Sequence, residues 1–135
     1  MNTPSIRTLQ QKSVQYRRTL LSMIKRANTG HTAGSLSSVD ILNVLYNRIM
    51  GVTPANFDAV ARDHYIQSKG HSVEALYTVL ADAGFYSAAE LDTFSSGGSH
   101  WVGHPTRKVP GVEHNTGALG HGLSVAVGLA LGMKK

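Results

Sequence analysis

The chain contains no cysteine, which excludes disulfide bridges and metal sites built on thiolates. The absence suits a reducing compartment, and we expect a cytoplasmic protein. No apolar run approaches the roughly 20 residues that a membrane span requires. The first residues also lack the apolar core of a signal peptide. We therefore expect neither a membrane partner nor a secretion signal.

Acidic residues are scarce, since eight Asp and Glu face 13 Lys and Arg, for a formal net charge of +5. A nucleic-acid-binding protein usually concentrates its positive charge in one patch, whereas these basic residues are spread along the chain. The charge suits anionic small molecules, and we expect no nucleic-acid partner. At 135 residues the chain is one domain in size, or part of a larger one.

Apolar spacing and capping signals predict a helix-rich α/β chain. Helices are expected over about 6–27, 38–50, 72–84, 87–94 and 123–135. A loop of small residues is expected at 31–37, a short strand at 63–68 and a long irregular stretch at 95–114. The last helix consists mostly of Ala, Gly, Val and Leu, a composition typical of a helix buried against close neighbours.

Four of the seven histidines directly follow a glycine, at His31, His71, His104 and His121. Glycine tolerates unusual backbone angles and lets a ligand approach the main chain. Histidine donates or accepts hydrogen bonds, carries a proton near neutral pH or binds a metal. The pattern indicates a cofactor site assembled from loop ends, with four unrelated turns as the alternative.

The segment Ser68–Ser72 predicts a strand that turns through Gly70 into a helix. Such a turn presents free N–H groups and the positive end of a helix dipole, and Lys69 and His71 add donors. It favours a phosphate or diphosphate, although a simple capped helix is an equal alternative.

A second glycine-rich turn, Thr116–Gly122, has three glycines in six residues. It indicates that the backbone packs closely against a flat or bulky group, with the apolar side chain of Leu119 in contact with an aromatic ring. Tight helix packing is the alternative interpretation.

His31 and His104 lie in segments of small or apolar residues, where either can bond a substrate oxygen and move a proton. Zinc is a rival hypothesis, but no pair of histidines has the helical metal-ligand spacing and no nearby acid completes a set. The Gly-x-Ser-x-Gly motif of a serine hydrolase is absent.

In their order, these motifs resemble the N-terminal part of transketolases, which use thiamine diphosphate. The matching stretches are residues 29–40, 62–63, 68–71, 103–105, 111–113 and 116–128. The segment Gly34–Ser38 looks like the split type, in which the N-terminal and C-terminal sections are separate chains. The resemblance implies a partial thiamine diphosphate-binding fold over residues 1–135, with a parallel sheet flanked by helices.

The resemblance also implies roles for individual residues. His71 would contact the diphosphate, and Gly117, Ala118 and Leu119 would line the thiamine. His31 and His104 would face the reacting carbon as catalytic residues. Such enzymes move a two-carbon ketol unit from a ketose phosphate to an aldose phosphate.

Two departures from the family pattern set further expectations. The family usually has Gln at the position of His121. Its loop that holds Mg²⁺ would follow Lys135, so no metal ligand is expected within this chain. The activating carboxylate lies in the C-terminal half of the family.

We therefore expect a fragment that is inactive alone and joins a C-terminal transketolase section in a homo- or hetero-oligomer. The alternatives are a related enzyme such as deoxyxylulose-phosphate synthase, and a non-catalytic remnant or binding subunit.

Overall fold

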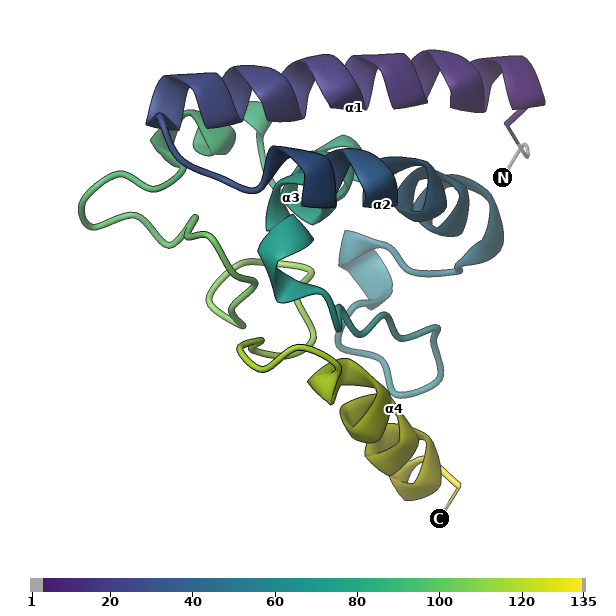
Figure 1. Ribbon diagram of the computed structural model, residues 1–135. Helices are drawn as coiled ribbons and strands as arrows, with labels where there is room; N and C mark the ends of the chain where they lie inside the picture. The colour runs from purple at the N-terminus through teal and green to yellow at the C-terminus, as the bar shows by residue number, and fades with distance from the viewer. Residues whose placement is uncertain (1–3, 135) are drawn as a thin grey trace.

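In a computed structural model, residues 4–134 form helices joined by long irregular segments (Figure 1). The α-helices are α1 (Ile6–Ala27), α2 (Thr32–Val44), α3 (Val73–Asp82) and α4 (His121–Gly132). A π-helical turn, η1 (Leu45–Ile49), extends α2. Three short 3-10 segments complete the order, namely η2 (Pro54–Asn56), η3 (Gly70–Ser72) and η4 (Ala88–Thr93). Among residues 4–134, no helix has the length and apolar character needed to cross a bilayer.

Helix α1 has the bounds that the sequence predicts. It begins after Ser5, whose hydroxyl accepts a hydrogen bond from the Thr8 N–H at 3.1 Å. It ends at Asn28, which adopts a left-handed conformation with φ 51°. Lys25 and Arg26 in the last turn complement the negative end of the helix dipole. Local signals thus fix both ends of this helix.

Helix α3 forms the centre of the core. Every residue from Val73 to Leu80 is buried, and α1 and α2 pack against it (Figure 1). Leu20 of α1 and Leu42 of α2 are at most 1% exposed in the same cluster. Burying each such leucine contributes about 1.5–3 kcal/mol. The three helices therefore form one apolar unit.

Two parts of the expected fold are not observed. Residues 63–68 form no strand, because a strand needs a neighbour to share its backbone hydrogen bonds. Within the described residues no such neighbour exists, so the expected parallel sheet is absent there.

The segment 31–37 was expected to be a loop, but most of it is helical, since α2 begins at Thr32. Small side chains allow this part of α2 to lie against neighbouring segments, and Ser35 is fully buried. The small residues of this segment therefore reflect the close packing of a helix and not the flexibility of a loop.

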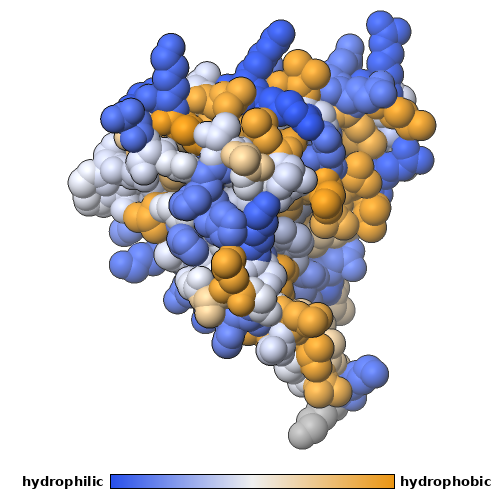
Figure 2. All heavy atoms as spheres, in the orientation of Figure 1, coloured by the Kyte–Doolittle hydropathy of each residue, from blue (hydrophilic) through white to orange (hydrophobic). Residues whose placement is uncertain are grey.

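Helix α4 stands away from the body of the molecule (Figure 1). The sequence predicts a buried helix, yet only Gly122 of α4 is buried. Leu123 is 72% exposed, and Val127 and Leu131 are also exposed. Figure 2 shows apolar surface along this helix. The described residues therefore do not cover the apolar faces of α4.

Arg17 and Asp40 join α1 to α2 by two hydrogen bonds of 2.9 and 2.7 Å. Hydrogen bonds from Arg17 and Ser13 lower the pKa of Asp40 to about 2. An unfolded Asp has a pKa near 3.9, so the pair stabilises the fold above about pH 4. The contribution is lost as the pH falls through about 2.

We predict that Asp40→Asn lowers the free energy of unfolding by less than about 1 kcal/mol at pH 7, because the pair is exposed to solvent. Urea unfolding at several pH values measures the gap between variant and wild type. The gap should shrink as the pH falls from 5 towards 2 (roughly the range between the two pKa values). A gap that stays constant over this range would contradict the assignment.

Candidate functional site

His31 and His71 lie side by side although 40 residues separate them in the sequence. Their ring centroids are 5.2 Å apart, and the rings meet edge to face at 60°. His31 is the residue before α2, and His71 lies in η3 at the start of α3. The packing of α2 on α3 thus unites two histidines that the sequence predicts as site residues.

Glu74 holds the backbone beside His31. This glutamate is fully buried, and its Oε1 accepts a hydrogen bond from the His31 N–H at 2.8 Å. Its Oε2 accepts one from the Ser35 hydroxyl at 2.6 Å. Gly30 has φ 141°, and a Cβ there would lie 2.6 Å from Glu74 Oε1. Only glycine therefore fits the approach of this loop to the carboxylate.

Sequence reasoning did not identify Glu74 as a site residue. The available signal was a carboxylate inside the mostly apolar run from Val73 to Leu80, where the other polar groups are the hydroxyls of Tyr77 and Thr78. A buried carboxylate needs hydrogen-bond partners, and these come from a segment about 40 residues earlier in the chain. Glu74 is thus a supporting residue of the site.

His104 lies against the same turn as His71. Its Nδ1 hydrogen-bonds with the Thr116 hydroxyl at 3.0 Å, and its carbonyl accepts from the Tyr77 hydroxyl at 3.2 Å. A Cβ on Gly70 would lie 2.7 Å from His104 Nδ1 and only 2.1 Å from Thr116 Oγ1. Gly70 therefore permits the approach of His104 to the turn that carries His71.

The turn Ser68–Ser72 connects the parts of the site. Lys69 Nζ donates to the Gly34 carbonyl at 3.2 Å and to the Ser37 hydroxyl at 2.9 Å. The Ser68 hydroxyl accepts from the Gly122 N–H at 3.2 Å. The turn thus contacts both α2 and the start of α4. It carries His71, and the side chains of His31 and His104 lie against it.

The residues predicted to line the thiamine lie on an open loop. Gly117, Ala118 and Leu119 are exposed, and Leu119 is 71% exposed. The loop is tied to the rest of the site by Thr116 at one end and Gly122 at the other. The ring of His121 lies 6.4 Å from that of His114 and belongs to a separate pair.

A partly buried ion pair joins the segments that carry Arg62 and Glu113. Arg62 binds Glu113 through both guanidinium nitrogens, and His64 Nδ1 lies 3.3 Å from the same carboxylate. Burial raises the pKa of Glu113, but the hydrogen bonds and charges of Arg62 and His64 together lower it below its usual value. Arg62 also lies 4.3 Å from the ring centroid of Phe57. Arg62 and Glu113, which belong to two of the matching stretches in the sequence, therefore bind each other and hold their two segments together.

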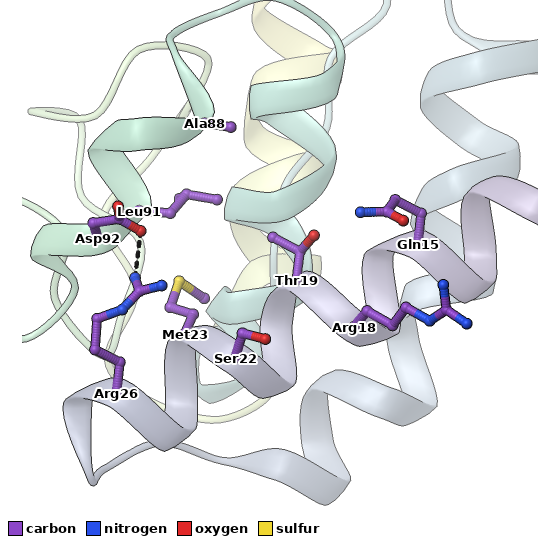
Figure 3. A pocket seen from close by; sticks show the side chains of 9 residues that line it. All are labelled: Gln15, Arg18, Thr19, Ser22, Met23, Arg26, Ala88, Leu91 and Asp92. Carbon is purple, nitrogen blue, oxygen red and sulfur yellow. Dashed lines mark hydrogen bonds and ion pairs between the residues drawn. The ribbon is translucent and has the colours of Figure 1, made fainter.

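A hollow of about 260 Å³ between α1 and η4 lies apart from these residues (Figure 3). Arg26 and Asp92 form an ion pair across it, and Met23 and Leu91 are buried beside them. None of the predicted site residues lines this hollow, which is a groove where two packed elements meet. Elsewhere in residues 4–134, no three His, Asp or Glu side chains gather closely enough to hold a metal ion.

Imidazole and ammonium groups beside the N–H groups at the start of a helix can hold an anion. Residues 9–135 match the family described as transketolase, thiamine diphosphate binding domain. The chain belongs to this family.

Similar proteins include one subunit of an apulose-4-phosphate transketolase from Phocaeicola vulgatus, 46% identical over 96% of this chain and 46% of the relative. One subunit of a 6-deoxy-6-sulfo-D-fructose transketolase from a Clostridium species is 38% identical over 93% of this chain and 46% of the relative. The solved transketolase from Leishmania mexicana aligns with a TM-score of 0.86 and 31% identity, covering 96% of this chain and 19% of that one. The chain thus spans just under half the length of the first two relatives, and the likeness places it in an α/β fold family.

We predict that replacing Glu74 with Leu destabilises the chain by about 1–3 kcal/mol, because it leaves the His31 N–H and the Ser35 hydroxyl without their partner. Glu74→Gln is the matched control, since its amide can accept from His31 and donate to Ser35. Urea unfolding measures stability, and amide hydrogen exchange at His31 measures the local bond. If Leu is tolerated as well as Gln at both readouts, the proposed support is wrong.

Proposed function

We propose that this chain is the thiamine diphosphate-binding, N-terminal portion of a transketolase. The enzyme would move a two-carbon ketol unit from a ketose phosphate to an aldose phosphate. The main support is the meeting of His31, His71 and His104 around one turn, from three segments of the chain. Family membership over residues 9–135 supports the cofactor class.

The residues present fit a diphosphate and a flat ring. His71 would hold the diphosphate, since its turn also carries Lys69 and leads directly into the first N–H groups of α3. Gly117, Ala118 and Leu119 would line the thiamine, and the space around Gly117 is open. When bound, thiamine diphosphate supplies the nucleophilic carbon of two-carbon transfer. Mg²⁺ would be held by ligands from outside this chain.

His104 and His31 would bind substrate oxygens and move protons. The bond between His104 Nδ1 and Thr116 leaves Nε2 available for a substrate oxygen. Glu74 fixes the main chain at His31, and the His31 ring packs against the ring of His71. Fixed imidazoles lower the cost of orienting groups during proton transfer.

The partner would be a C-terminal transketolase section, on a second chain or beyond this one. Relatives named as subunits support the first arrangement. Two of them are named for sugars with a phosphate or a sulfonate group, which supports an anionic sugar as substrate. We propose a cytoplasmic oligomer in which both sections complete the site.

We predict that His104→Ala lowers kcat of the reconstituted enzyme by about 10²–10⁴-fold, the usual contribution of a positioned acid or base. The assay measures two-carbon transfer by this chain with a C-terminal transketolase section, thiamine diphosphate and Mg²⁺. Thiamine diphosphate binding by calorimetry should change little in this variant.

His114→Ala is the matched control, because His114 lies outside the group formed by His31, His71 and His104. The activity of this variant should match that of the wild type. Failure of the assembled wild-type protein to bind thiamine diphosphate would overturn the proposed function itself. An active His104→Ala variant would overturn only the role of that residue.

A further inference from the structure

A groove between α1 and α2 has no role in the function proposed above. Its volume is about 750 Å³. Because the two helices run in opposite directions, the groove extends from the start of α1 and the end of α2 to the pair of Arg17 and Asp40 (Figure 1). None of His31, His71 and His104 lines it, so it is separate from the candidate site.

Apolar side chains are exposed on both walls of the groove. Ile6 and Val14 of α1 and Val44 of α2 line it and are all exposed to solvent. Ile41, three residues before Val44 on the same face of α2, is 64% exposed. Figure 2 shows apolar surface in this part of the molecule. A contiguous exposed apolar surface of this kind indicates a site that binds another protein.

The buried polar group beneath the groove is already paired. Asn43 is buried, and its Nδ2 donates to the Leu9 carbonyl at 2.7 Å and to the Ser13 hydroxyl at 2.8 Å. Its Oδ1 accepts from Asn47 at 3.0 Å. This floor therefore offers a small polar ligand no unpaired group, whereas the apolar walls suit the side chains of another helix.

The two ends of the groove differ in charge. At one end the Asp40 side chain binds Arg17 but is still 60% exposed, and a carboxylate can accept more hydrogen bonds than these two. At the other end Arg48 forms no ion pair within residues 4–134. Asp40 and Arg48 are eight residues apart along α2 and η1, roughly 12 Å, with Val44 midway between them.

We propose that the groove binds the same groove of a second copy of this chain. A two-fold axis at Val44 would make the two α2 helices antiparallel and place Arg48 of each copy beside Asp40 of the partner subunit. The exposed side chains of Ile41 and Val44 would pack together around this axis. One patch would thus serve both copies, as in most two-fold dimers. The inference does not depend on the proposed function.

Charge favours this occupant over α4, the other helix with an exposed apolar surface. Helix α4 contains no Asp or Glu, so α4 of a second copy would leave Arg48 without an acid. That contact would also join two different surfaces, which builds open chains of molecules or larger rings. Only the contact of the groove with itself pairs both of its ends and closes at the dimer.

Association can be measured on the full 135-residue chain without cofactor. Sedimentation equilibrium over roughly 5–500 μM should show monomers and dimers with a micromolar Kd, as for a small interface. A chain that stays monomeric over this range would overturn the proposal.

Matched variants distinguish the groove from α4. Ile41→Gln with Val44→Gln should raise the Kd of the dimer at least about tenfold, because apolar area is removed from the interface. Leu123→Gln with Val127→Gln removes a similar apolar surface from α4 and should leave the Kd unchanged. Circular dichroism checks that both variants keep the helix content of the wild type. A dimer that is lost only in the α4 variant would assign the contact to α4 and overturn the proposal.

The charge pairing has its own test. Arg48→Glu should weaken the dimer about tenfold, since each new carboxylate would lie beside Asp40 of the partner subunit. Arg18→Glu, on α1 outside the groove, lowers the net charge by the same amount and should not weaken the dimer. General repulsion between two positive chains would fall in both variants and strengthen association. Equal weakening in the two variants would therefore contradict the pairing.

The absence of cysteine allows a direct test of the symmetry axis. Val44→Cys would bring two thiols together at the axis, where dissolved oxygen can join them, and a disulfide needs Cα atoms within about 7 Å. Electrophoresis without reductant should show a linked dimer for this variant. Val127→Cys, on exposed α4, is the control and should link more slowly. Equal rates would refute the proposed axis.

A C-terminal transketolase section is the rival occupant of the groove. Addition of this section should leave the Val44→Cys cross-link and the NMR signals of Ile41 and Val44 unchanged. If the section instead prevents the cross-link and shifts these signals, the groove belongs to that partner and the proposal is wrong. Failure of the assembled protein to bind thiamine diphosphate would reject the proposed function but not the dimer.

Discussion

The hydrogen bonds of the Glu74 carboxylate set the position of the His31 backbone beside the other histidines of the group. The residue lies on α3, the helix around which α1 and α2 pack, so the carboxylate cannot move without disturbing the core. It holds the His31 N–H and the Ser35 hydroxyl, which together fix the start of α2. The buried helix α3 therefore carries the anchor for His31, an exposed residue.

The same helix also organises the other two histidines. His71 lies in the 3-10 turn that leads into α3, and the carbonyl of His104 accepts from Tyr77 one turn further along. Gly70 brings the histidine segments close, because any side chain there would meet His104 and Thr116. The geometry of the group thus follows from one buried helix and a glycine beside its N-terminus.

Local signals explain which parts of the fold could be predicted from sequence. Helix α1 has a serine cap, a left-handed asparagine and an apolar stripe, all within its own residues or directly beside them. The extended segment 63–68 has strand-like composition, but strand formation depends on a distant partner that composition cannot reveal. The start of α2 was misassigned as a loop because glycine and serine suit both turns and close helix packing.

In the candidate site, too, some residues could be predicted from the sequence and others could not. Glycine-histidine pairs are visible in the sequence, and three of the four contribute histidines to one group. The fourth, at His121, pairs with His114 instead. Glu74 was missed because a lone carboxylate is usually a surface residue, and its two partners become neighbours only after α2 packs on α3.

The scarcity of acidic residues has a structural consequence. Asp40, Asp82, Asp92 and Glu113 each bind a lysine or arginine, and Glu74 is committed to two hydrogen bonds. Asp63 accepts a backbone hydrogen bond from Gly51 at 2.6 Å. Most of the carboxylates therefore serve the fold.

Within residues 4–134, part of the excess positive charge forms no ion pair, as at Arg107 and Lys108. On α1, by contrast, acids pair with half of the six basic residues. The few acids thus determine how α1 is held to α2, α3 and η4.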